Sequence, residues 1–364
     1  MNTANAMNAN TATAMNVNTA TAVNVHTAKA MNTAKRAPMQ TRRSLLLLLA
    51  ASYTLTACGA DAATAAGEPK PYTLRIGSIG SGNKLTGVFG YLREEQKLLP
   101  LLVRAGVTAV ESYTFPNGPD LNQALVAGEL DVALYGDTPA LVARGAGQPT
   151  RLIAQSGIGN DAGVVAKKEG GPTSLAELAG KKVAVQKGSY MHRYLLASLE
   201  DLGVQPQEIV HIYNSDIEAA LERGDVDAAA VPSANVEALR AKGYPVIDVA
   251  SKDHPGYLGT GATVSPESFL KEHAGFPQVW QQAQQEGTKL AKADWDGYLA
   301  FSVKAGGFPA EITKATTLRS QLPDEPFPAA GLTLLANTKT FLVKQGFIKS
   351  DFSIDEWIAP GARR

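Results

Sequence analysis

Residues 120–133, DLNQALVAGELDVA, return in outline at residues 216–229, DIEAALERGDVDAA, 96 positions later. Both copies keep the spacing Ala-Leu-x-x-Gly-x-x-Asp, in which an amphipathic run ends at Gly128 or Gly224 and an acidic turn leads into a short apolar run. Glycine accepts the positive φ with which many helices end, and an apolar run after it is typical of a buried strand. The sequence therefore predicts one helix–turn–strand unit that is used twice.

An apolar strand that runs into a Gly-Ser loop precedes each copy of this unit, at residues 74–78 and 183–189. We therefore expect two similar α/β lobes. Ligands of open α/β sheets bind beyond the carboxyl ends of the strands, so two facing lobes place two such crevices on either side of one cleft.

The first 57 residues have the composition of a basic export leader. They contain no Asp or Glu, and the run Leu45–Leu49 is followed by small residues up to Cys58, the only cysteine. This apolar run of about 13 residues is shorter than the roughly 20 that span a membrane. We interpret residues 39–57 as a signal peptide and expect the protein to be exported. Residues 1–38 cannot build a core and are interpreted as a low-complexity tail or an over-extended start, and residues 58–71 as a flexible tether.

The end of this leader indicates how the protein is held after export. Leu55-Thr56-Ala57-Cys58 resembles the lipobox of bacterial lipoproteins, which implies a lipid anchor at Cys58 and a membrane-anchored protein in the periplasm or at the cell surface. The alternative is an ordinary leader that is cleaved elsewhere, with Cys58 a free thiol. The pair Arg42-Arg43 leaves both general secretion and twin-arginine export open. A single cysteine excludes an internal disulfide.

Composition limits the partners and the number of domains. From Cys58 onward there are 307 residues with 29 Lys and Arg against 34 Asp and Glu, since the leader holds five of the 34 basic residues, and the net charge is about −5. With no basic stripe, nucleic-acid binding is not expected. The length fits two lobes of common domain size. After Ala57 no stretch is long and apolar enough to span a membrane.

The chain becomes mostly helical after about residue 265, with apolar positions at helical spacing in 276–292 and 332–344. We expect these helices to pack back onto the first lobe. Lobe 1 would then comprise residues 72–163 and 262–358, and lobe 2 residues 164–261, with a hinge where the chain crosses between them.

Three loops that open helices supply the candidate ligand site. Each has a composition that leaves backbone N–H groups free at a helix N-terminus, where an anion is favoured. Asp137 or Thr138 suits the N-cap of the second helix, with Pro139 as its first residue, and Ser189 suits the N-cap of the third, which is expected to end near Leu202. The alternative is that the loops only cap their own helices. The candidate ligand contacts are Ser78, Gly80, Ser81 and Asn83 in the first loop, Gly136, Asp137 and Thr138 in the second, and Gln186, Lys187, Gly188, Ser189 and Tyr190 in the third.

No catalytic or metal centre is evident in the sequence. Asn83 interrupts the phosphate-loop pattern before Lys84, and no Gly-x-Ser-x-Gly elbow surrounds Ser189. No His, Cys and carboxylate residues have metal-ligand spacing. We therefore expect a protein that is not an enzyme and that has no cofactor and no metal. His192 is expected to pack in the lobe core, and Tyr190 and Met191 either to form apolar walls for a ligand tail or to bury against the neighbouring lobe.

These segments resemble the periplasmic solute-binding proteins of ABC importers, in the branch that binds aliphatic sulfonates, taurine and nitrate. The resemblance covers residues 72–360 and is strongest at residues 115–119, 124–139 and 174–189. It implies the type II periplasmic binding-protein fold, an α/β fold with a ligand cleft between two lobes and the C-terminal helices on lobe 1. It also implies a monomer that presents a small organic oxyanion to an ABC permease, with an aliphatic sulfonate as the leading ligand and sulfur metabolism as the setting.

One departure from the family follows the second copy of the repeat. Sulfonate and taurine binders commonly carry an aromatic residue and an acid-Pro pair there, whereas residues 230–235 are AVPSAN. The wall of the cleft is then smaller and uncharged, with Ser233 as its candidate ligand contact. A taurine-like amine loses its carboxylate partner, which favours a plain or bulkier sulfonate. Taurine, nitrate, a thiamine-precursor-like heterocycle, an enzyme on the same fold and a sensor or scaffold lipoprotein are the alternatives.

Overall fold

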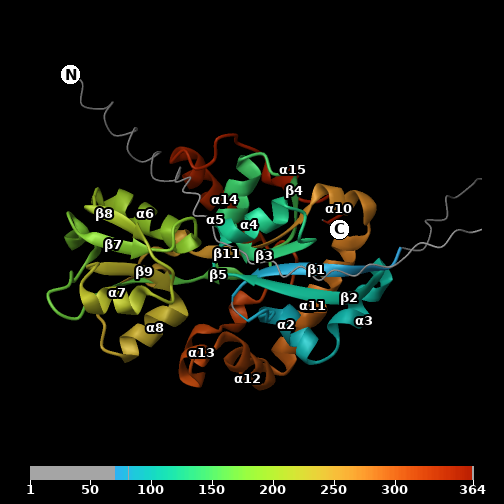
Figure 1. The fold of residues 1–364 in the computed structure, drawn as a ribbon, viewed down its shortest axis with the longest axis horizontal. Coiled ribbons are helices and arrows are strands. Elements are labelled where there is room, and N and C mark those ends of the chain that lie inside the picture. The colour runs from blue at the N-terminus through green and yellow to red at the C-terminus, as the bar shows by residue number, and fades with distance from the viewer. Residues whose placement is uncertain (1–69, 81, 363–364) are drawn as a thin grey trace, which may run out of the picture. The chain divides into compact units, whose positions relative to one another are not determined.

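The computed structural model describes residues 70–80 and 82–362. The predicted tail, signal peptide, lipidation site and all but the last residues of the tether therefore lie outside the described residues, and so does Ser81. The described chain forms two β-sheets with helices on their faces (Figure 1). None of the described helices is both long and apolar enough to cross a membrane.

The first sheet has the strand order β2-β1-β3-β11-β4, with β5 paired to β11. β1 runs parallel to β2 and β3, whereas β11 runs antiparallel to β3 and β4. The strands are β1 (Tyr72–Ile79), β2 (Val107–Phe115), β3 (Val132–Gly136), β4 (Thr150–Ala154), β5 (Ile158–Asn160) and β11 (Gly259–Pro266).

The second sheet repeats this plan in the order β8-β7-β9-β6-β10. β7 runs parallel to β8 and β9, and β6 runs antiparallel to β9 and β10, so β7 corresponds to β1 and β9 to β3. Its strands are β6 (Ala162–Ala166), β7 (Lys182–Val185), β8 (Glu208–His211), β9 (Ala228–Pro232) and β10 (Val246–Val249). We call the two sheets with their helices lobe 1 and lobe 2; the residue boundaries of the lobes stay predictions.

Helices connect the strands within each lobe and form most of the chain after β11. The α-helices are α2 (Gly87–Glu94), α3 (Leu98–Leu102), α4 (Gly118–Val126), α5 (Asp137–Gly145), α6 (Tyr190–Leu202), α7 (Ile217–Arg223), α8 (Ser233–Ala241), α9 (Ala250–Asp253), α10 (Glu267–Glu272), α11 (Phe276–Ala293), α12 (Trp295–Gly306), α13 (Ala310–Thr316), α14 (Ala329–Lys344) and α15 (Ile354–Trp357). Short 3₁₀ helices are η2 (Val103–Ala105), η3 (Leu175–Leu178), η4 (Pro255–Tyr257) and η5 (Arg319–Gln321).

The repeated helix–turn–strand unit is present in both lobes, as α4 followed by β3 and as α7 followed by β9. Gly128 follows α4 with φ 74° and Gly224 ends α7 with φ 71°. A side chain at either position would be strained at that φ, which explains why glycine stops both helices. The predicted unit is therefore confirmed.

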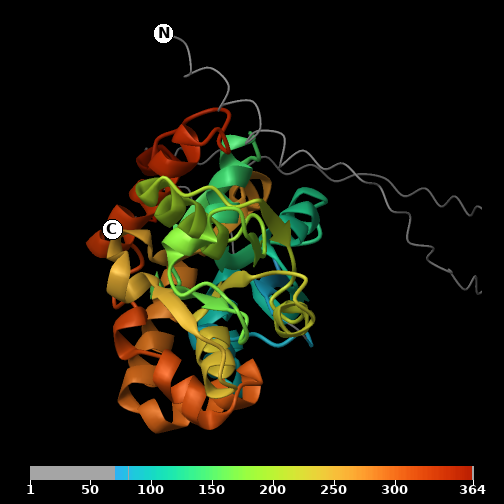
Figure 2. The ribbon, with the colours of Figure 1, turned by 90° about the vertical axis from the view of Figure 1, so that its left-hand side faces the viewer.

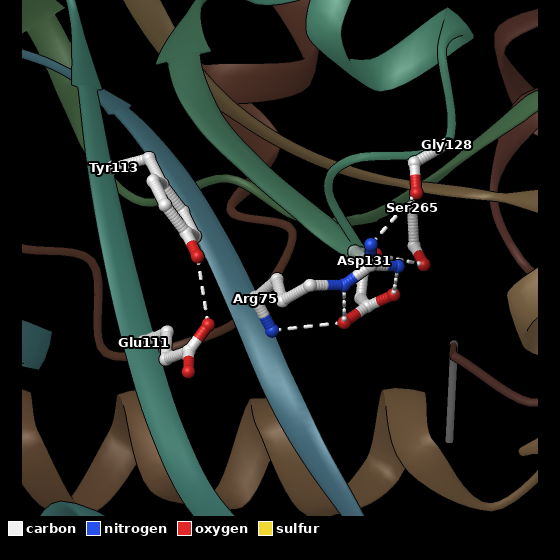
Figure 3. A network of polar contacts seen from close by, with 6 residues as sticks. All are labelled: Arg75, Glu111, Tyr113, Gly128, Asp131 and Ser265. Atoms are coloured by element: carbon white, nitrogen blue, oxygen red, sulfur yellow. Dashed lines mark hydrogen bonds and ion pairs between the residues drawn. The ribbon is translucent and has the colours of Figure 1, made fainter. Parts of the chain in front are cut away.

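The aspartate of each acidic turn fastens the turn to the equivalent strand of its lobe, β1 in lobe 1 and β7 in lobe 2. In lobe 1 the Asp131 carboxylate accepts hydrogen bonds from the backbone N–H of Arg75 at 2.8 Å and from its guanidinium at 3.1 and 2.6 Å (Figure 3). In lobe 2 the Asp227 carboxylate accepts from the backbone N–H of Lys182 at 3.0 Å and from Lys167 Nζ at 2.7 Å. The backbone N–H of each aspartate donates back to the same strand residue. The repeated Gly-x-x-Asp thus joins each helix–turn–strand unit to its sheet.

The helices after β11 share the hydrophobic core of lobe 1. The Trp280 ring of α11 stacks on Phe89 of α2 with 4.0 Å between centroids, and both side chains are buried. Leu335 of α14 and Trp357 of α15 are fully buried in the same cluster as strands β1 and β3. Figure 2 shows these C-terminal helices, coloured orange to red, gathered at the left of the view. Burial of such large aromatic side chains supplies several kcal/mol in total.

Candidate ligand-binding cleft

A cleft of about 340 Å³ lies where the strands of the two sheets end. Its lining includes the carboxyl ends of β1 and β3 from lobe 1, and Pro232 at the end of β9 with Gln186 just after β7 from lobe 2. This is the position in which open α/β sheets bind ligands. The volume suits a small organic molecule.

Three helices begin at this cleft. Residues 86–89 at the start of α2, Gly136 and Pro139 at the start of α5, and residues 189–191 at the start of α6 all line it. The side chains of Phe89 and Met191 are 2 % and 3 % exposed and belong to the cores of lobes 1 and 2. Little of Phe89 or Met191 is therefore exposed to the cleft. The first N–H groups of a helix have no intrahelical partner, so these helix starts concentrate hydrogen-bond donors there.

Five of the sequence-predicted ligand contacts line the cleft: Ser78, Gly136, Gln186, Ser189 and Tyr190. Ser78 is 4 % exposed, and its Oγ has no hydrogen-bond partner within the part of the chain that the structure describes. A buried hydroxyl without a partner costs free energy, which a ligand oxygen in the cleft would relieve.

Ser189 is the N-cap of α6, as predicted. Its Oγ accepts a hydrogen bond from the backbone N–H of His192 at 3.2 Å and donates to the backbone oxygen of Gln186 at 2.6 Å. The helix ends at Leu202, followed by Gly203 with φ 64°. Because this cap satisfies the third N–H of the helix, the N–H groups of Tyr190 and Met191 are the ones left without an intrahelical partner.

The prediction for the start of α5 was wrong by one or two residues. Gly136 is the N-cap, Asp137 is the first helical residue, and Pro139 is the third. Asp137 is fully buried, and its Oδ1 accepts from the N–H of Thr138 at 2.5 Å and from the Thr138 hydroxyl at 2.9 Å. Its Oδ2 accepts from the N–H of Thr260 at 2.9 Å and from the Thr338 hydroxyl at 3.3 Å. These donors occupy both carboxylate oxygens, so Asp137 is held by protein groups.

The remaining described candidate contacts are not part of the cleft lining. Asn83 has φ 52° and is fastened to β2, since its Oδ1 accepts from the N–H of Thr114 at 3.1 Å. The backbone N–H groups of Lys187 and Gly188 donate to the Nδ1 atoms of His211 and His192, at 3.0 and 3.4 Å. The other candidates outside the lining are Gly80, Asp137, Thr138 and Ser233.

Sequence reasoning missed several residues of the lining. Thr86 is the N-cap of α2, makes no side-chain cap hydrogen bond and lines the cleft. A threonine before an apolar run is a recognised helix start, and that signal was available in the sequence. Ser156 and Asn160 come from the crossing between the lobes, and Asn214 from the loop after β8. No local pattern singles these three out, because only the tertiary fold brings them to the cleft.

No Lys, Arg, His, Asp or Glu among the described residues lines the cleft. Burial, together with Lys187 and His211, lowers the pKa of the nearby His192 to about 4, so this imidazole is neutral at pH 7. His192 is 6 % exposed, so it is buried as its sequence position suggested, and its ring lies 6.0 Å from that of Phe347, which follows α14. Among the described residues no group of three or more His, Cys, Asp or Glu side chains is placed to hold a metal ion. Neutral hydrogen-bond donors therefore dominate the chemistry of the cleft.

Two hydrogen bonds join the lobes beside the cleft. Gln186 Nε2 donates to the backbone oxygen of Pro116 at 3.0 Å, and Asn117 Nδ2 donates to the Tyr213 hydroxyl at 3.4 Å. Asn117 and Tyr213 are 96 residues apart, the same interval as the repeat. Their following neighbours, Gly118 and Asn214, both line the cleft. The residues that precede the two repeated units thus meet at equivalent positions.

Known proteins resemble this chain over most of its length. A putative aliphatic sulfonates-binding protein of Escherichia coli K12 is 28% identical over 255 residues, which are 68% of this chain and 76% of that protein. The taurine-binding periplasmic protein of the same organism is 26% identical over 258 residues, 65% of this chain and 78% of that protein.

Solved structures confirm the predicted periplasmic binding-protein fold with two lobes. The alkanesulfonate-binding protein SsuA from Xanthomonas axonopodis pv. citri, bound to MOPS, superimposes with a TM-score of 0.65 at 21% identity, over 79% of this chain and 98% of that one. The desulfurization enzyme DSZB has the same fold, with a TM-score of 0.60 at 18% identity over 80% and 97% of the two chains. A family model described as NMT1/THI5 like matches residues 106–296, which is more than half of the sequence. The chain therefore belongs to the NMT1/THI5-like family.

Proposed function

We propose that this protein is the exported solute-binding component of an ABC importer and that it binds a small organic oxyanion, with an aliphatic sulfonate as the leading ligand. The observation that carries the proposal is the cleft between two lobes, where three helices begin and no charged side chain lies in the lining. Relatives that bind aliphatic sulfonates and taurine support it.

A sulfonate matches the donors of this cleft. Its charge is spread over three oxygens, each of which accepts hydrogen bonds, and it has no proton to donate near neutral pH. Helix N-termini offer N–H donors and a positive partial charge, which stabilise an anion without a cationic side chain. The unpartnered Ser78 hydroxyl supplies one further donor.

The wall after β9 favours a plain or bulkier sulfonate over taurine. Pro232 lines the cleft, and Ser233 begins α8 with its backbone N–H donating to the oxygen of Asp161. Without a carboxylate in the lining, the ammonium group of taurine would be desolvated without an ionic partner, which is unfavourable. Taurine, nitrate and a thiamine-precursor-like heterocycle remain alternatives for the binding test.

We propose binding rather than turnover. The fold also occurs in a desulfurization enzyme, so the fold alone does not decide between the two. The described residues that line the cleft offer hydroxyl, amide and backbone groups but no Cys, His, Lys or carboxylate that would serve as nucleophile or base. After prolonged incubation with the protein, an alkanesulfonate is expected to be recovered unchanged. Release of sulfite would contradict this expectation.

We also propose that Cys58 carries a lipid anchor and that the protein acts as a monomer in the periplasm or at the cell surface, where it presents its ligand to a membrane permease. The lipobox-like sequence at residues 55–58 supports the anchor. Intact-mass analysis of protein from the native host tests it: a diacylated N-terminal Cys58 is expected, and an unmodified Cys58 would reject the anchor.

A thermal-shift panel tests the ligand class. It comprises alkanesulfonates, taurine, sulfate esters, nitrate and thiamine-like heterocycles. A ligand at one hundred times its Kd stabilises the folded state by about 2.7 kcal/mol, which gives a clear rise in Tm. The largest rise is expected with an alkanesulfonate, and no response to any oxyanion would overturn the proposal.

Ser189→Asp tests the position of the site. Aspartate is as good an N-cap as serine, so α6 should persist, whereas the added negative charge faces the anion. The matched control is Ser174→Asp, at the N-cap of η3 in the same lobe and outside the cleft lining. Binding is expected to be lost in Ser189→Asp and kept in Ser174→Asp; unchanged affinity in Ser189→Asp would place the site elsewhere.

A further inference from the structure

The chain crosses between the lobes twice, and the second crossing is held by both lobes at once. It leads from η4 into β11, and residues Leu258–Thr260 lie where β11 begins. Gly259 and Thr260 also pair with β5 of the first crossing. The two crossings therefore form one small ribbon between the lobes.

Lobe 1 holds this ribbon through Asp137. The fully buried carboxylate accepts a hydrogen bond from the backbone N–H of Thr260 at 2.9 Å and another from the Thr338 hydroxyl of α14 at 3.3 Å. Asp137 is the first residue of α5, and its neighbour Gly136 lines the cleft. The same turn therefore contacts the cleft on one side and the crossing on the other.

Lobe 2 holds the ribbon through Arg193 of α6. This side chain is 2 % exposed, and its Nη2 donates to the backbone oxygen of Leu258 at 3.0 Å. Its Nε has no hydrogen-bond partner, and none of the ion pairs between described residues includes Arg193. Burial lowers the pKa of Arg193, and the negative charge of Asp137 opposes that effect. The carboxylate that offsets this buried cation thus belongs to the other lobe.

Tyr190, which lines the cleft, contacts both crossings. Its ring lies against Gly259, where an added Cβ would stand 2.9 Å from the ring, and its hydroxyl donates to the backbone oxygen of Asp161 at 3.2 Å. Gly259 and Asp161 belong to the two crossings. The first turn of α6 is therefore in contact with the ligand cleft and with both crossings.

We propose that Asp137 and Arg193 are positioning residues, a buried pair of opposite charges that clamps residues 258–260 from the two lobes and sets the angle between the lobes. A single buried charge is costly to fold around, whereas two opposite charges near one another offset much of that cost. Because α5 and α6 both begin at the cleft, the clamp also sets how tightly the lobes close on a ligand. This last consequence rests on the proposed binding function.

A double-mutant cycle tests the pairing without any ligand. The variants are Asp137→Asn, Arg193→Gln and the double variant, and the readout is the urea midpoint of unfolding. Each single variant is expected to lower the midpoint, and the double variant to recover at least half of the summed loss. Strictly additive losses would overturn the pairing. The control is Arg144→Gln, which breaks an ion pair with Glu267 inside lobe 1.

The angle between the lobes is a readout that a merely structural role would not change. Spin labels at Val126→Cys on α4 and Leu202→Cys on α6, both exposed positions, report the distance between the lobes when Cys58 is replaced by serine. Asp137→Asn and Arg193→Gln are expected to shift or broaden this distance, whereas Arg144→Gln leaves it unchanged. The same distance in all variants would overturn the proposal.

Arg193→Lys keeps the proposal testable if Arg193→Gln does not fold. It retains the charge but not the guanidinium, so a wild-type distance is expected, and an altered distance would overturn the charge pairing.

Ligand release tests the effect on function: Asp137→Asn is expected to release a bound alkanesulfonate at least tenfold faster, and an unchanged rate would overturn the effect on closure. If no sulfonate binds the wild type while the unfolding cycle and the distances behave as expected, the proposed function fails and the clamp stands.

Discussion

Replacing Asp131 by alanine tests how the repeated acidic turn stabilises the fold. Its carboxylate accepts three hydrogen bonds from Arg75, one from the backbone and two from the guanidinium. An unpaired backbone N–H in a sheet costs about 1–3 kcal/mol. The Arg75 side chain is 37% exposed, so solvent screens its pairing with Asp131, which contributes at most about 1 kcal/mol. Asp131→Ala is therefore expected to lower the free energy of unfolding by roughly 1–4 kcal/mol.

The measurement is urea unfolding followed by circular dichroism, with three companion variants. Arg75→Gln leaves the backbone hydrogen bond in place and should cost only about 1 kcal/mol. Asp227→Ala removes the equivalent contact to Lys182 and should approach the cost of Asp131→Ala. Asp225→Ala breaks an ion pair with Arg223 whose side chains are 53% and 63% exposed, and should cost no more than about 0.5 kcal/mol. If Asp131→Ala costs no more than Asp225→Ala, the turn does not fasten the lobe as argued.

Three further predictions follow from single residues. Burial, together with Lys187 and His211, lowers the pKa of His192 to about 4, so on acidification the unfolded chain takes up a proton at this histidine before the folded state does. The free energy of unfolding should therefore fall by about 3 kcal/mol between pH 6.5 and pH 4. His192→Gln should remove this pH dependence when urea unfolding is measured against pH. Burial alone would raise the pKa of Asp227, but hydrogen bonds from Lys167 and from the Lys182 N–H outweigh burial and lower that pKa. The stabilisation by Asp227 is therefore complete above the usual Asp pKa and is lost as the pH falls below it. The stability of Asp227→Asn should depend less steeply on pH in the acid range, and the same acid dependence as the wild type would contradict this. Gly118→Ala places a Cβ 2.4 Å from the Pro139 ring, so it should lower the Tm by the equivalent of about 1–3 kcal/mol and weaken ligand binding; wild-type values for both would show that the start of α4 has room.

Local sequence signals were sufficient where neighbouring residues decide the structure. The spacing around Gly128 and Gly224 predicted both helix–turn–strand units, because a positive φ after a helix needs glycine whatever surrounds it. Ser189 was recognised as an N-cap for the same reason, since its acceptor role involves only residues up to three positions away.

The cleft was predicted only in part, because distant residues decide which side chains reach it. Asp137 is a residue type expected at a helix N-cap that faces a ligand. In the structure Thr260 and Thr338, which lie 123 and 201 positions later, donate hydrogen bonds to its carboxylate in the interior. Asn83 looks like a loop donor, yet its pairing with Thr114 on β2 holds it beside the cleft lining. No local pattern reports such long-range partners. The ligand contacts themselves stay predictions.

Asn117 and Tyr213 each stand three residues before one of the two repeated units and are hydrogen bonded to each other. In a symmetric homodimer, a residue meets its own counterpart only on the two-fold axis. This polypeptide therefore keeps, within a single chain, a contact of the kind found at the centre of a dimer interface, and the ligand cleft opens beside that pseudo-axis. Both halves therefore contribute residues to the ligand cleft. Where the two halves carry different residues at corresponding positions, such as Asn214 and Gly118, the cleft is asymmetric and gives a bound molecule one preferred orientation. The repeated helix–turn–strand units keep their shared pattern all the same.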